Sequence, residues 1–290
     1  MMKKIAIIGA TGMLGEPVTK AFINEGFDVS LLVRNVNKAK QIFPSNVRLV
    51  QGDLRDIESI GQFLSEQEGL YLNLSVKQNS GKSDFQPERE GLDHVLQIAK
   101  NNTTVTRIGY LSSLIHLYQG QNGFDWWAFD LKQEAVSKIK NSGLPYSIFY
   151  PSTFMENYDK GSYRQGKNIV LAGTSKYKMY LISGNDYARQ VVKTFQRDNG
   201  NNEYVIQGKE GFTADEAAKV FVENYTKEKL KIMKAPMALM SFMGLFSNKF
   251  NYGAKIVDAL NNYPEKFEAE KTWLDLGEPQ TKFIDYIQNV

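Results

Sequence analysis

Residues 5–15 read IAIIGATGMLG, an apolar run that leads into a turn with three regularly spaced glycines. Four apolar residues without alternation are typical of a parallel strand buried on both faces. Gly9 suits the tight turn, Gly12 lets the backbone approach a pyrophosphate, and Gly15 lets the next helix pack close to the strand. That helix would direct unpaired N–H groups at the phosphates. The stretch predicts a dinucleotide site; the alternative is a structural turn without a ligand.

The chain after this turn alternates expected strands with helical patterns. The further expected strands are Val29 to Val33, Val47 to Val50, Gly69 to Leu74, Val105 to Leu111 and Tyr146 to Tyr150. This alternation predicts an α/β fold, a doubly wound parallel sheet of the Rossmann type. We expect residues 1–152 to form the NAD(P)-binding domain, with residues 184–207 returning to its sheet. Residues 153–183 and 208–290 are expected to form a smaller, mostly helical substrate-side lobe.

The composition excludes several classes of function. The absence of cysteine among 290 residues rules out disulfides, thiolate chemistry and cysteine-ligated zinc, and no metal site is predicted. A net charge of +3 is too small to indicate nucleic acid or a membrane surface as a partner. The first strand begins too early to leave room for a signal peptide, so we expect a cytoplasmic protein. Its expected partner is a small-molecule substrate, and a homo-oligomer or a protein partner stays open.

The residues after the second strand predict which dinucleotide is bound. NAD-specific sites usually place an acid at the end of that strand to hold the ribose 2′-hydroxyl. Here the position is taken by Arg34, and Lys38 and Lys40 follow it. Three cations favour a 2′-phosphate and therefore NADP(H). The alternative is a solvated loop that carries basic residues by chance.

The glycine motif GATGMLG resembles that of the extended and atypical short-chain dehydrogenase/reductases. In typical members, a Tyr-x-x-x-Lys pair and a serine at the end of strand five carry the chemistry. Ser112 or Ser113 stands at the serine position and Lys132 at the lysine position, but Ala128 replaces the tyrosine. By this resemblance Lys132 is a proton donor or ribose ligand; otherwise it is an exposed helix lysine.

The missing tyrosine narrows the resemblance to the NmrA-like branch of atypical short-chain dehydrogenases. The stretch from Phe129 to Asn157, which contains GLPY and FMEN, is similar to that branch, as are ISGNDYA and VRLVQGDLRD. The branch contains NADPH-dependent reductases of quinones and plant phenolics, and also nucleotide-sensing regulators without turnover. Asp53 in GDLRD resembles the acid that meets the adenine amino group, although it could equally cap a helix or form a turn.

These arguments give a set of predicted site residues. The cofactor contacts are expected at Gly9, Thr11, Gly12, Met13, Leu14, Gly15, Arg34, Lys38, Asp53, Leu54, Asn73, Lys132 and Pro151. The catalytic candidates are Lys132, Ser112 and His116, the last as an acid near neutral pH or as a histidine without a role. The substrate candidates are Trp126, Phe154 and Met155, with core packing as the alternative for Trp126. We expect an NADP(H)-dependent reductase of a small, fairly apolar carbonyl, enone or quinone, or else a non-catalytic NADP(H) sensor that acts through a protein partner.

The segment Met237 to Phe246, MALMSFMGLF, would be apolar almost all round if it formed a helix. Such a helix must be buried, adsorbed to a membrane or facing a ligand. We expect it to pack in the core, with a mobile pocket wall as the second choice. The surrounding apolar segment, Ala235 to Ser247, is too short to span a bilayer.

Overall fold

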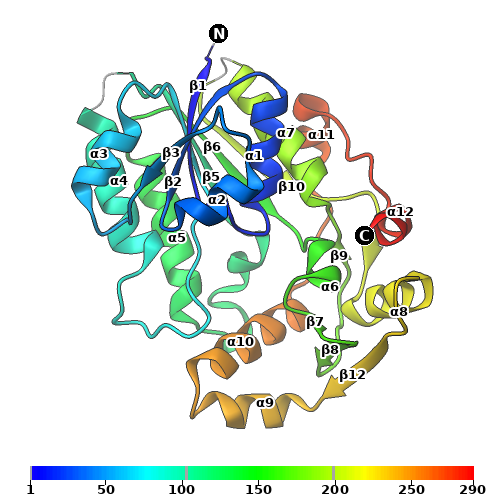
Figure 1. The fold of residues 1–290 in the computed structure, drawn as a ribbon. Helices are drawn as coiled ribbons and strands as arrows, with labels where there is room; N and C mark the ends of the chain where they lie inside the picture. Colours follow the sequence, from blue (N-terminus) through cyan, green and yellow to red (C-terminus); the bar gives the residue numbers. More distant parts are fainter. Residues whose placement is uncertain (1, 102–103, 198–199) are drawn as a thin grey trace.

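The computed structural model describes residues 2–101, 104–197 and 200–290. A seven-stranded sheet with the order β10-β6-β5-β4-β1-β2-β3 forms its centre (Figure 1). Every neighbouring pair in this sheet is parallel. The strands are β1 (Lys4–Ile8), β2 (Asp28–Val33), β3 (Arg48–Gln51), β4 (Gly69–Leu72), β5 (Arg107–Leu111), β6 (Tyr146–Pro151) and β10 (Asn202–Ile206). The predicted doubly wound fold is confirmed, and β10 is the expected late strand that returns to the sheet.

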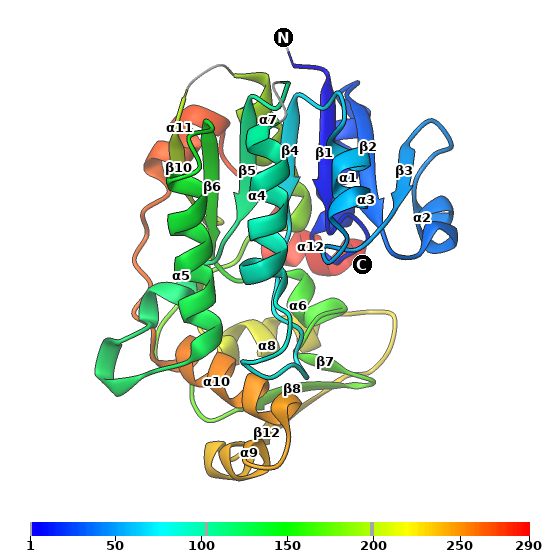
Figure 2. The ribbon, with the colours of Figure 1, turned by 90° about the vertical axis from the view of Figure 1, so that its left-hand side faces the viewer.

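Helices cover both faces of the sheet (Figures 1 and 2). One face carries α1 (Gly15–Asn24), α7 (Gly184–Gln196) and α11 (Glu270–Leu276), and the other carries α3 (Ile57–Leu64), α4 (Leu92–Asn101) and α5 (Trp127–Lys140). A helix that the sequence analysis did not predict, α2 (Val36–Ile42), lies beside β3. Because both faces are covered, Ile5, Ala6 and Ile7 are fully buried, which explains the apolar run in β1.

The strand order reverses between β1 and β4. From this pair, β2 and β3 extend the sheet in one direction, and β5, β6 and β10 extend it in the other. Ligands of doubly wound sheets bind at the carboxyl ends of the strands beside such a reversal. The topology therefore places the candidate site at the loops that follow β1 and β4.

The second part of the molecule lies below those carboxyl ends (Figure 2). It contains the short helices η2 (Leu114–Tyr118) and η3 (Gln121–Gly123), and then α6 (Glu156–Asp159), β7 (Arg164–Gln165), β8 (Asn168–Ala172), β9 (Met179–Tyr180), β11 (Gly211–Phe212), α8 (Ala214–Asn224), β12 (Lys231–Ala235), α9 (Met237–Gly244), α10 (Asn248–Asn262) and α12 (Phe283–Asn289). The predicted capping box opens α8, with Thr213 and Glu216 bonded reciprocally.

This lobe differs from the prediction in two ways. It contains more strand than expected, because β12 pairs in parallel with β8 to extend a small sheet. In addition, α11 returns to the central sheet, where Thr272 Oγ1 donates a 2.7 Å hydrogen bond to the carbonyl oxygen of Val205 in β10. Residues 208–290 therefore do not all lie on the substrate side of the molecule.

The prediction that Met237 to Phe246 packs in the core is wrong. Helix α9 projects at the far end of the lobe (Figure 2), and Gly244 is its single buried residue. Phe242 is 60% exposed and Phe246 78% exposed. An apolar helix pattern looks the same in sequence whether the helix is covered or not. Within the described chain, no helix combines the length and hydropathy that crossing a membrane requires.

Candidate functional site

The turn after β1 requires glycine at two positions, because a Cβ there would clash with backbone carbonyl oxygens. Gly9 has φ +83°, and a Cβ at this position would lie 2.2 Å from the carbonyl oxygen of Asn73. A Cβ on Gly15 would lie 2.0 Å from the carbonyl oxygen of Gly9. Any larger residue would push the turn away from β4 or α1 away from β1. The tight turn at Gly9 and the close packing at Gly15 are thus confirmed, while contacts of Gly9, Gly12 and Gly15 with a cofactor stay predictions.

The first turn of α1 is open to a ligand. Leu14 occupies its N-cap position and makes no side-chain capping bond, while the N–H of Glu16 donates to the carbonyl oxygen of Gly12 at 3.0 Å and Pro17 has no N–H. Other helices of the molecule are capped by their own side chains, for example α3 by Asp56 and α7 by Ser183. Free N–H groups at a helix N-terminus suit an anion. The turn residues Thr11, Met13 and Leu14 border this helix start, and their contacts with the phosphates of a dinucleotide stay a prediction.

Two of the three predicted cations lie beside this turn. Arg34 directly follows β2, the neighbour of β1, and is exposed. The Lys38 ammonium lies 3.5 Å from the carbonyl oxygen of Thr11, which brings α2 against the glycine turn. Lys40 is two residues further along α2, so its side chain leaves the helix from another side. Arg34 and Lys38 stay the predicted pair for the 2′-phosphate, and we no longer propose Lys40 as a third contact.

Asp53 and Leu54 lie in the loop between β3 and α3. The Asp53 carboxylate accepts a 3.0 Å hydrogen bond from the backbone N–H of Arg55, so this residue is the turn former that the sequence left open. It does not cap α3, because Asp56 does so. The carbonyl oxygen of Leu54 bonds Nδ1 of His94 at 2.7 Å. The adenine contact at Asp53 stays a prediction, and His94 holds the loop.

Lys132 does not lie exposed on its helix. Its ammonium lies 3.1 Å from the carbonyl oxygen of Leu74, next to the end of β4, and 3.3 Å from that of Leu111 at the end of β5. It forms an ion pair with Glu88, whose side chain is 1% exposed. Tyr110 donates a 2.7 Å hydrogen bond to the same carboxylate. Glu88 belongs to a single π-helical turn, η1 (Pro87–Gly91), a distortion that is frequent at functional sites.

His116 does not fit the predicted role of an acid near neutral pH. Burial, with the nearby charge of Lys132, lowers the pKa of His116 to about 4, so its ring is neutral at pH 7. Its Nδ1 lies 3.2 Å from Ser112 Oγ, and both side chains are buried. His116 lines an open groove of ≈ 450 Å³ between α5 and β10, away from the glycine turn. We therefore withdraw Ser112 and His116 as catalytic candidates and treat them as a structural pair.

Because His116 is buried in its neutral form, the stability of the folded protein should fall at acid pH. Unfolded His116 binds a proton below its ordinary pKa of 6.5, whereas the folded residue stays neutral until about pH 4. The folded state therefore loses about 1–2 kcal/mol of stability as the pH falls from 7 to 5. Urea unfolding at the two pH values should show a smaller loss for His116→Gln than for the unmodified protein. An equal loss in both would contradict the burial of a neutral ring.

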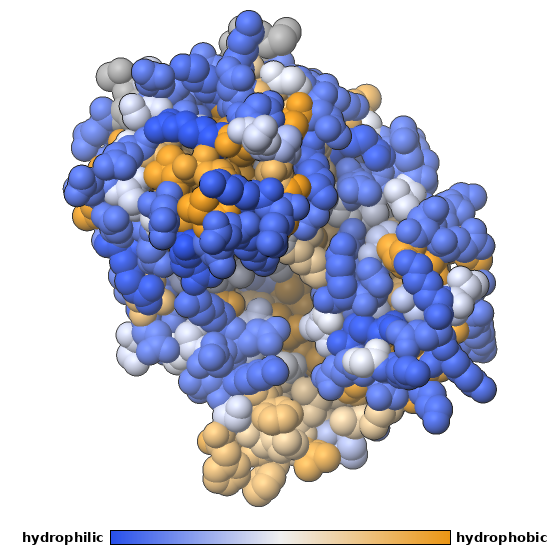
Figure 3. All heavy atoms as spheres, viewed as in Figure 1, coloured by the Kyte–Doolittle hydropathy of each residue, from blue (hydrophilic) through white to orange (hydrophobic). Residues whose placement is uncertain are grey.

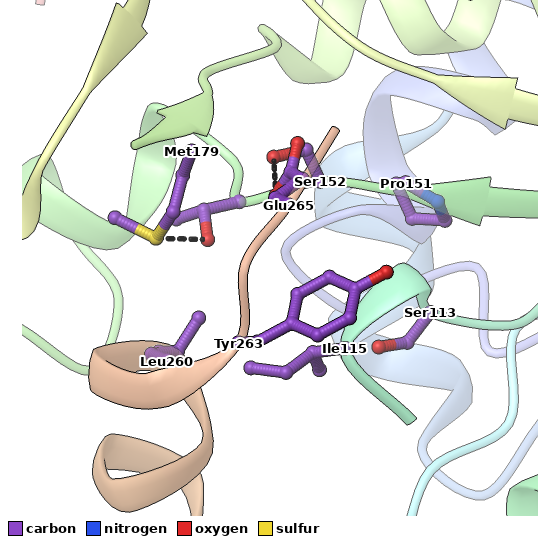
Figure 4. Close-up of a pocket in the computed structure, with 9 residues that line it drawn as sticks. Ser113, Ile115, Pro151, Ser152, Met179, Leu260, Tyr263 and Glu265 are labelled. Carbon is purple, nitrogen blue, oxygen red and sulfur yellow. Dashed lines mark hydrogen bonds between the residues drawn. The ribbon is translucent and has the colours of Figure 1, made fainter. Parts of the chain in front are cut away.

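A second cavity, of ≈ 50 Å³, lies at the ends of β5 and β6 on the substrate side (Figure 4). Its walls combine apolar side chains with hydroxyl and carboxyl groups, and they are Ser113, Ile115, Pro151, Ser152, Thr153, Met179, Leu260, Tyr263 and Glu265. Ser113, rather than Ser112, thus faces the cavity at the end of β5. Pro151, predicted beside the nicotinamide, borders the same space.

Tyr263 and Glu265 enter this cavity from the segment that follows α10. Figure 4 shows the Tyr263 ring reaching toward the side formed by Ser113 and Pro151. The Glu265 carboxylate accepts hydrogen bonds of 2.9 Å from Ser152 Oγ and 2.7 Å from Gln207 Nε2. Burial raises the pKa of the Glu265 carboxyl above its ordinary value. Burial, with Glu265 nearby, raises the pKa of Tyr263 to about 12, so its phenol keeps its proton.

The three predicted substrate residues are core residues instead. Trp126 packs against Phe129 and Tyr252, with ring centroids 5.1 Å and 5.0 Å away. Phe154 packs edge-on against Tyr187, and Met155 is 1% exposed. Neither cavity described above includes any of them. Each belongs to a buried hydrophobic cluster, and we no longer propose them as substrate contacts.

Tyr263, Glu265 and Glu88 were not predicted as site residues from the sequence. Tyr263 lies more than 100 positions after Lys132, and the last motif used for the resemblance, ISGNDYA, ends at Ala188. The available local signal was Pro264, which stops a helix and fixes the chain that follows it. For Glu88, the signal was a glutamate followed by apolar Leu92 at helical spacing, which indicates a face that turns inward. Neither signal identifies a site without the fold.

Comparisons with known proteins agree with this geometry. The model of the NmrA-like family matches residues 1–278. The chain is 25% identical over 264 residues to photosystem II assembly factor Ycf39 of Guillardia theta, an alignment that covers 88% of this chain and 81% of that protein.

Two solved structures share the fold. The NADPH-dependent quinone oxidoreductase of Escherichia coli, complexed with NADPH, has a TM-score of 0.72 and 20% identity, covering 98% of this chain and 99% of that one. The Citrobacter sp. triphenylmethane reductase, complexed with NADP(H), has a TM-score of 0.73 and 17% identity, covering 99% of each chain. At these identities the likeness is one of fold.

Proposed function

The chain belongs to the NmrA-like family, and from this premise we propose that it is an NADP(H)-dependent reductase of a small, fairly apolar carbonyl, enone or quinone. One observation carries the proposal: the glycine turn, the cations and the Tyr263 cavity all lie at the same edge of the sheet. The solved neighbours bind NADPH or NADP(H), and one of them is named a quinone oxidoreductase.

The residues of the chain divide the work as follows. The open first turn of α1 binds the pyrophosphate, and Arg34 with Lys38 binds the 2′-phosphate. The bound cofactor supplies a hydride for the acceptor. The cavity of ≈ 50 Å³ must widen to admit an acceptor, and Ile115, Met179 and Leu260 would then give it apolar walls. Ser113 and Tyr263 can donate hydrogen bonds to the oxygen that gains negative charge. Glu88 holds Lys132 at the ends of β4 and β5. There the positive charge of Lys132 stabilises the negative charge on the same oxygen.

The cofactor preference follows from Arg34. Arg34→Asp should raise the Kd for NADPH about tenfold or more, because a charge-assisted contact contributes about 1.5–3 kcal/mol. The Kd for NADH should change little. Lys40→Asp makes the same charge change on the far side of α2 and serves as the control. Titration calorimetry measures all three proteins, and equal losses in both variants would show that only the net charge matters.

The phenol of Tyr263 is the proposed substitute for the missing tyrosine. Tyr263→Phe keeps the ring and removes the hydroxyl, so kcat should fall about tenfold or more while the Kd for NADPH stays the same. Tyr177→Phe, on a residue 41% exposed at the surface, is the matched control. Unchanged kcat in Tyr263→Phe would assign proton donation to water or to Ser113.

The assay that tests the function measures consumption of NADPH by the purified chain with a panel of quinones, enones and aldehydes. Turnover with at least one acceptor supports the reductase. The second candidate is a non-catalytic NADP(H) sensor that acts through a protein partner, and Ala128 at the usual tyrosine position and the assembly-factor relative favour it. Tight binding of NADPH without consumption by any acceptor would select the sensor.

A further inference from the structure

The arm formed by β12, α9 and the start of α10 carries an exposed apolar face. Leu239, Phe242, Leu245 and Phe246 are 51%, 60%, 76% and 78% exposed. Helix α9 packs on α10 through Met240 and Gly244, which lie near Gly253 and Asn251, and this leaves the bulky side chains outside. We call these four residues, with Ile232, Met233 and Phe250, the α9 face. Figure 3 shows apolar atoms gathered over α9 at the lower end of the molecule.

The stretch of sequence that contains the α9 face is rich in lysine. Residues 226–257 contain six lysines and a single acidic residue, Glu228, whereas the whole chain carries a net charge of only +3. Glu228 is itself paired with Arg164. Lys234 pairs with Asp215, and Lys255 donates to the carbonyl oxygen of Asp125. The remaining lysines of residues 226–257, at positions 227, 229, 231 and 249, are exposed.

We propose that the α9 face adsorbs to the surface of a bilayer that contains anionic lipids. Exposed phenylalanine, leucine and methionine side chains enter the boundary between headgroups and acyl chains, and the exposed lysines of the same stretch contact the anionic headgroups. The apolar segment is too short to cross the bilayer, so the helix lies in its surface. The proposal goes beyond the reductase activity and holds whether or not the chain turns over NADPH. It also replaces our prediction, made from the net charge, that no membrane surface is a partner. The net charge of the whole chain combines a basic stretch, residues 226–257, with an acidic remainder.

The positive charge near the α9 face favours an anionic bilayer over a second copy of the chain as its partner. A two-fold dimer through the α9 face would set the lysines of each arm against those of the other. Like charges facing each other across an interface are unfavourable, whereas an anionic surface complements all of them at once.

The test uses the full chain and sedimentation with vesicles. Vesicles of phosphatidylcholine with an equal share of phosphatidylglycerol should bind the protein, and pure phosphatidylcholine should bind it at least about tenfold more weakly. The double variant F242S/F246S should lower the partition coefficient about tenfold or more, and so should K229E/K231E. Leu274→Ser, on a residue of α11 that is 87% exposed, is the matched control and should bind like the unmodified protein. Calorimetric titration with NADPH confirms that each variant is folded.

Three outcomes would overturn the proposal. The first is no binding to anionic vesicles, and the second is equal binding by F242S/F246S and the unmodified protein. The third is a concentration-dependent dimer in sedimentation velocity that F242S/F246S abolishes while vesicles bind neither form, since a second copy would then cover the face. If F242S/F246S fails to bind NADPH, the single variant Leu245→Ser, on a residue 76% exposed, replaces it in the same comparison.

Discussion

Gly9→Ala should weaken NADPH binding by a factor of about one hundred or more. The new Cβ would lie 2.2 Å from the carbonyl oxygen of Asn73, and the φ of +83° is itself strained for alanine. The backbone N–H of Asn73 donates to the carbonyl oxygen of Ile8 at 3.1 Å, so relief of the clash must separate the ends of β1 and β4. That movement displaces the glycine turn from the first turn of α1, where the pyrophosphate is proposed to bind.

The control variant Gly26→Ala introduces the backbone strain of alanine at a positive φ without a clash of the new Cβ. Gly26 has φ +79°, and among the described residues nothing lies within 4 Å of its Cβ position. This control should cost about 1 kcal/mol in the free energy of unfolding and leave the Kd for NADPH unchanged. Calorimetric titration and urea unfolding measure both variants. If Gly9→Ala bound NADPH as Gly26→Ala does, the glycine turn would not be the phosphate site.

Lys132→Met should lower the free energy of unfolding by about 3–5 kcal/mol, because it leaves the Glu88 carboxylate buried without its ion partner. For a chain of this size the melting temperature should fall by roughly 10 °C. Turnover should fall as well, since Lys132 lies at the ends of β4 and β5 beside the proposed cofactor.

The double variant Lys132→Met with Glu88→Gln tells the two roles apart. It removes both charges while the amide can still accept the hydrogen bond from Tyr110, so most of the stability should return. Turnover should stay low, because the positive charge near the acceptor is still missing. Recovery of turnover together with stability would show that Lys132 acts only by neutralising Glu88.

The sequence was sufficient for the parts of the site that depend on local backbone chemistry. The glycine spacing after an apolar run predicted the turn between β1 and α1. Glycine has no Cβ, so it allows the strand and the helix to lie this close together. Arg34 followed from its position at the end of the second strand, and Lys132 followed from the resemblance to short-chain dehydrogenases. Local periodicity and chain order are visible in one sequence.

The rest depended on contacts between distant segments. Tyr263 and Ser113 line the same cavity although they lie far apart in the sequence, and no local pattern predicts that proximity. Phe154 was expected at the substrate because it follows β6, but its side chain turns into the aromatic core beside Tyr187. The exposure of α9 could not be predicted, because hydrophobic periodicity does not reveal whether another surface covers a helix.

The central claim is direct transfer of hydride from NADPH to an apolar acceptor at this edge of the sheet. The most direct measurement uses NADPH that carries deuterium at both hydrogens of the nicotinamide C4, with an α,β-unsaturated ketone as acceptor. Mass spectrometry of the reduced ketone should find deuterium bound to carbon, and the yield should fall in Lys132→Met and Tyr263→Phe. Reduced ketone without deuterium, or NADPH that binds and is never consumed, would contradict the account.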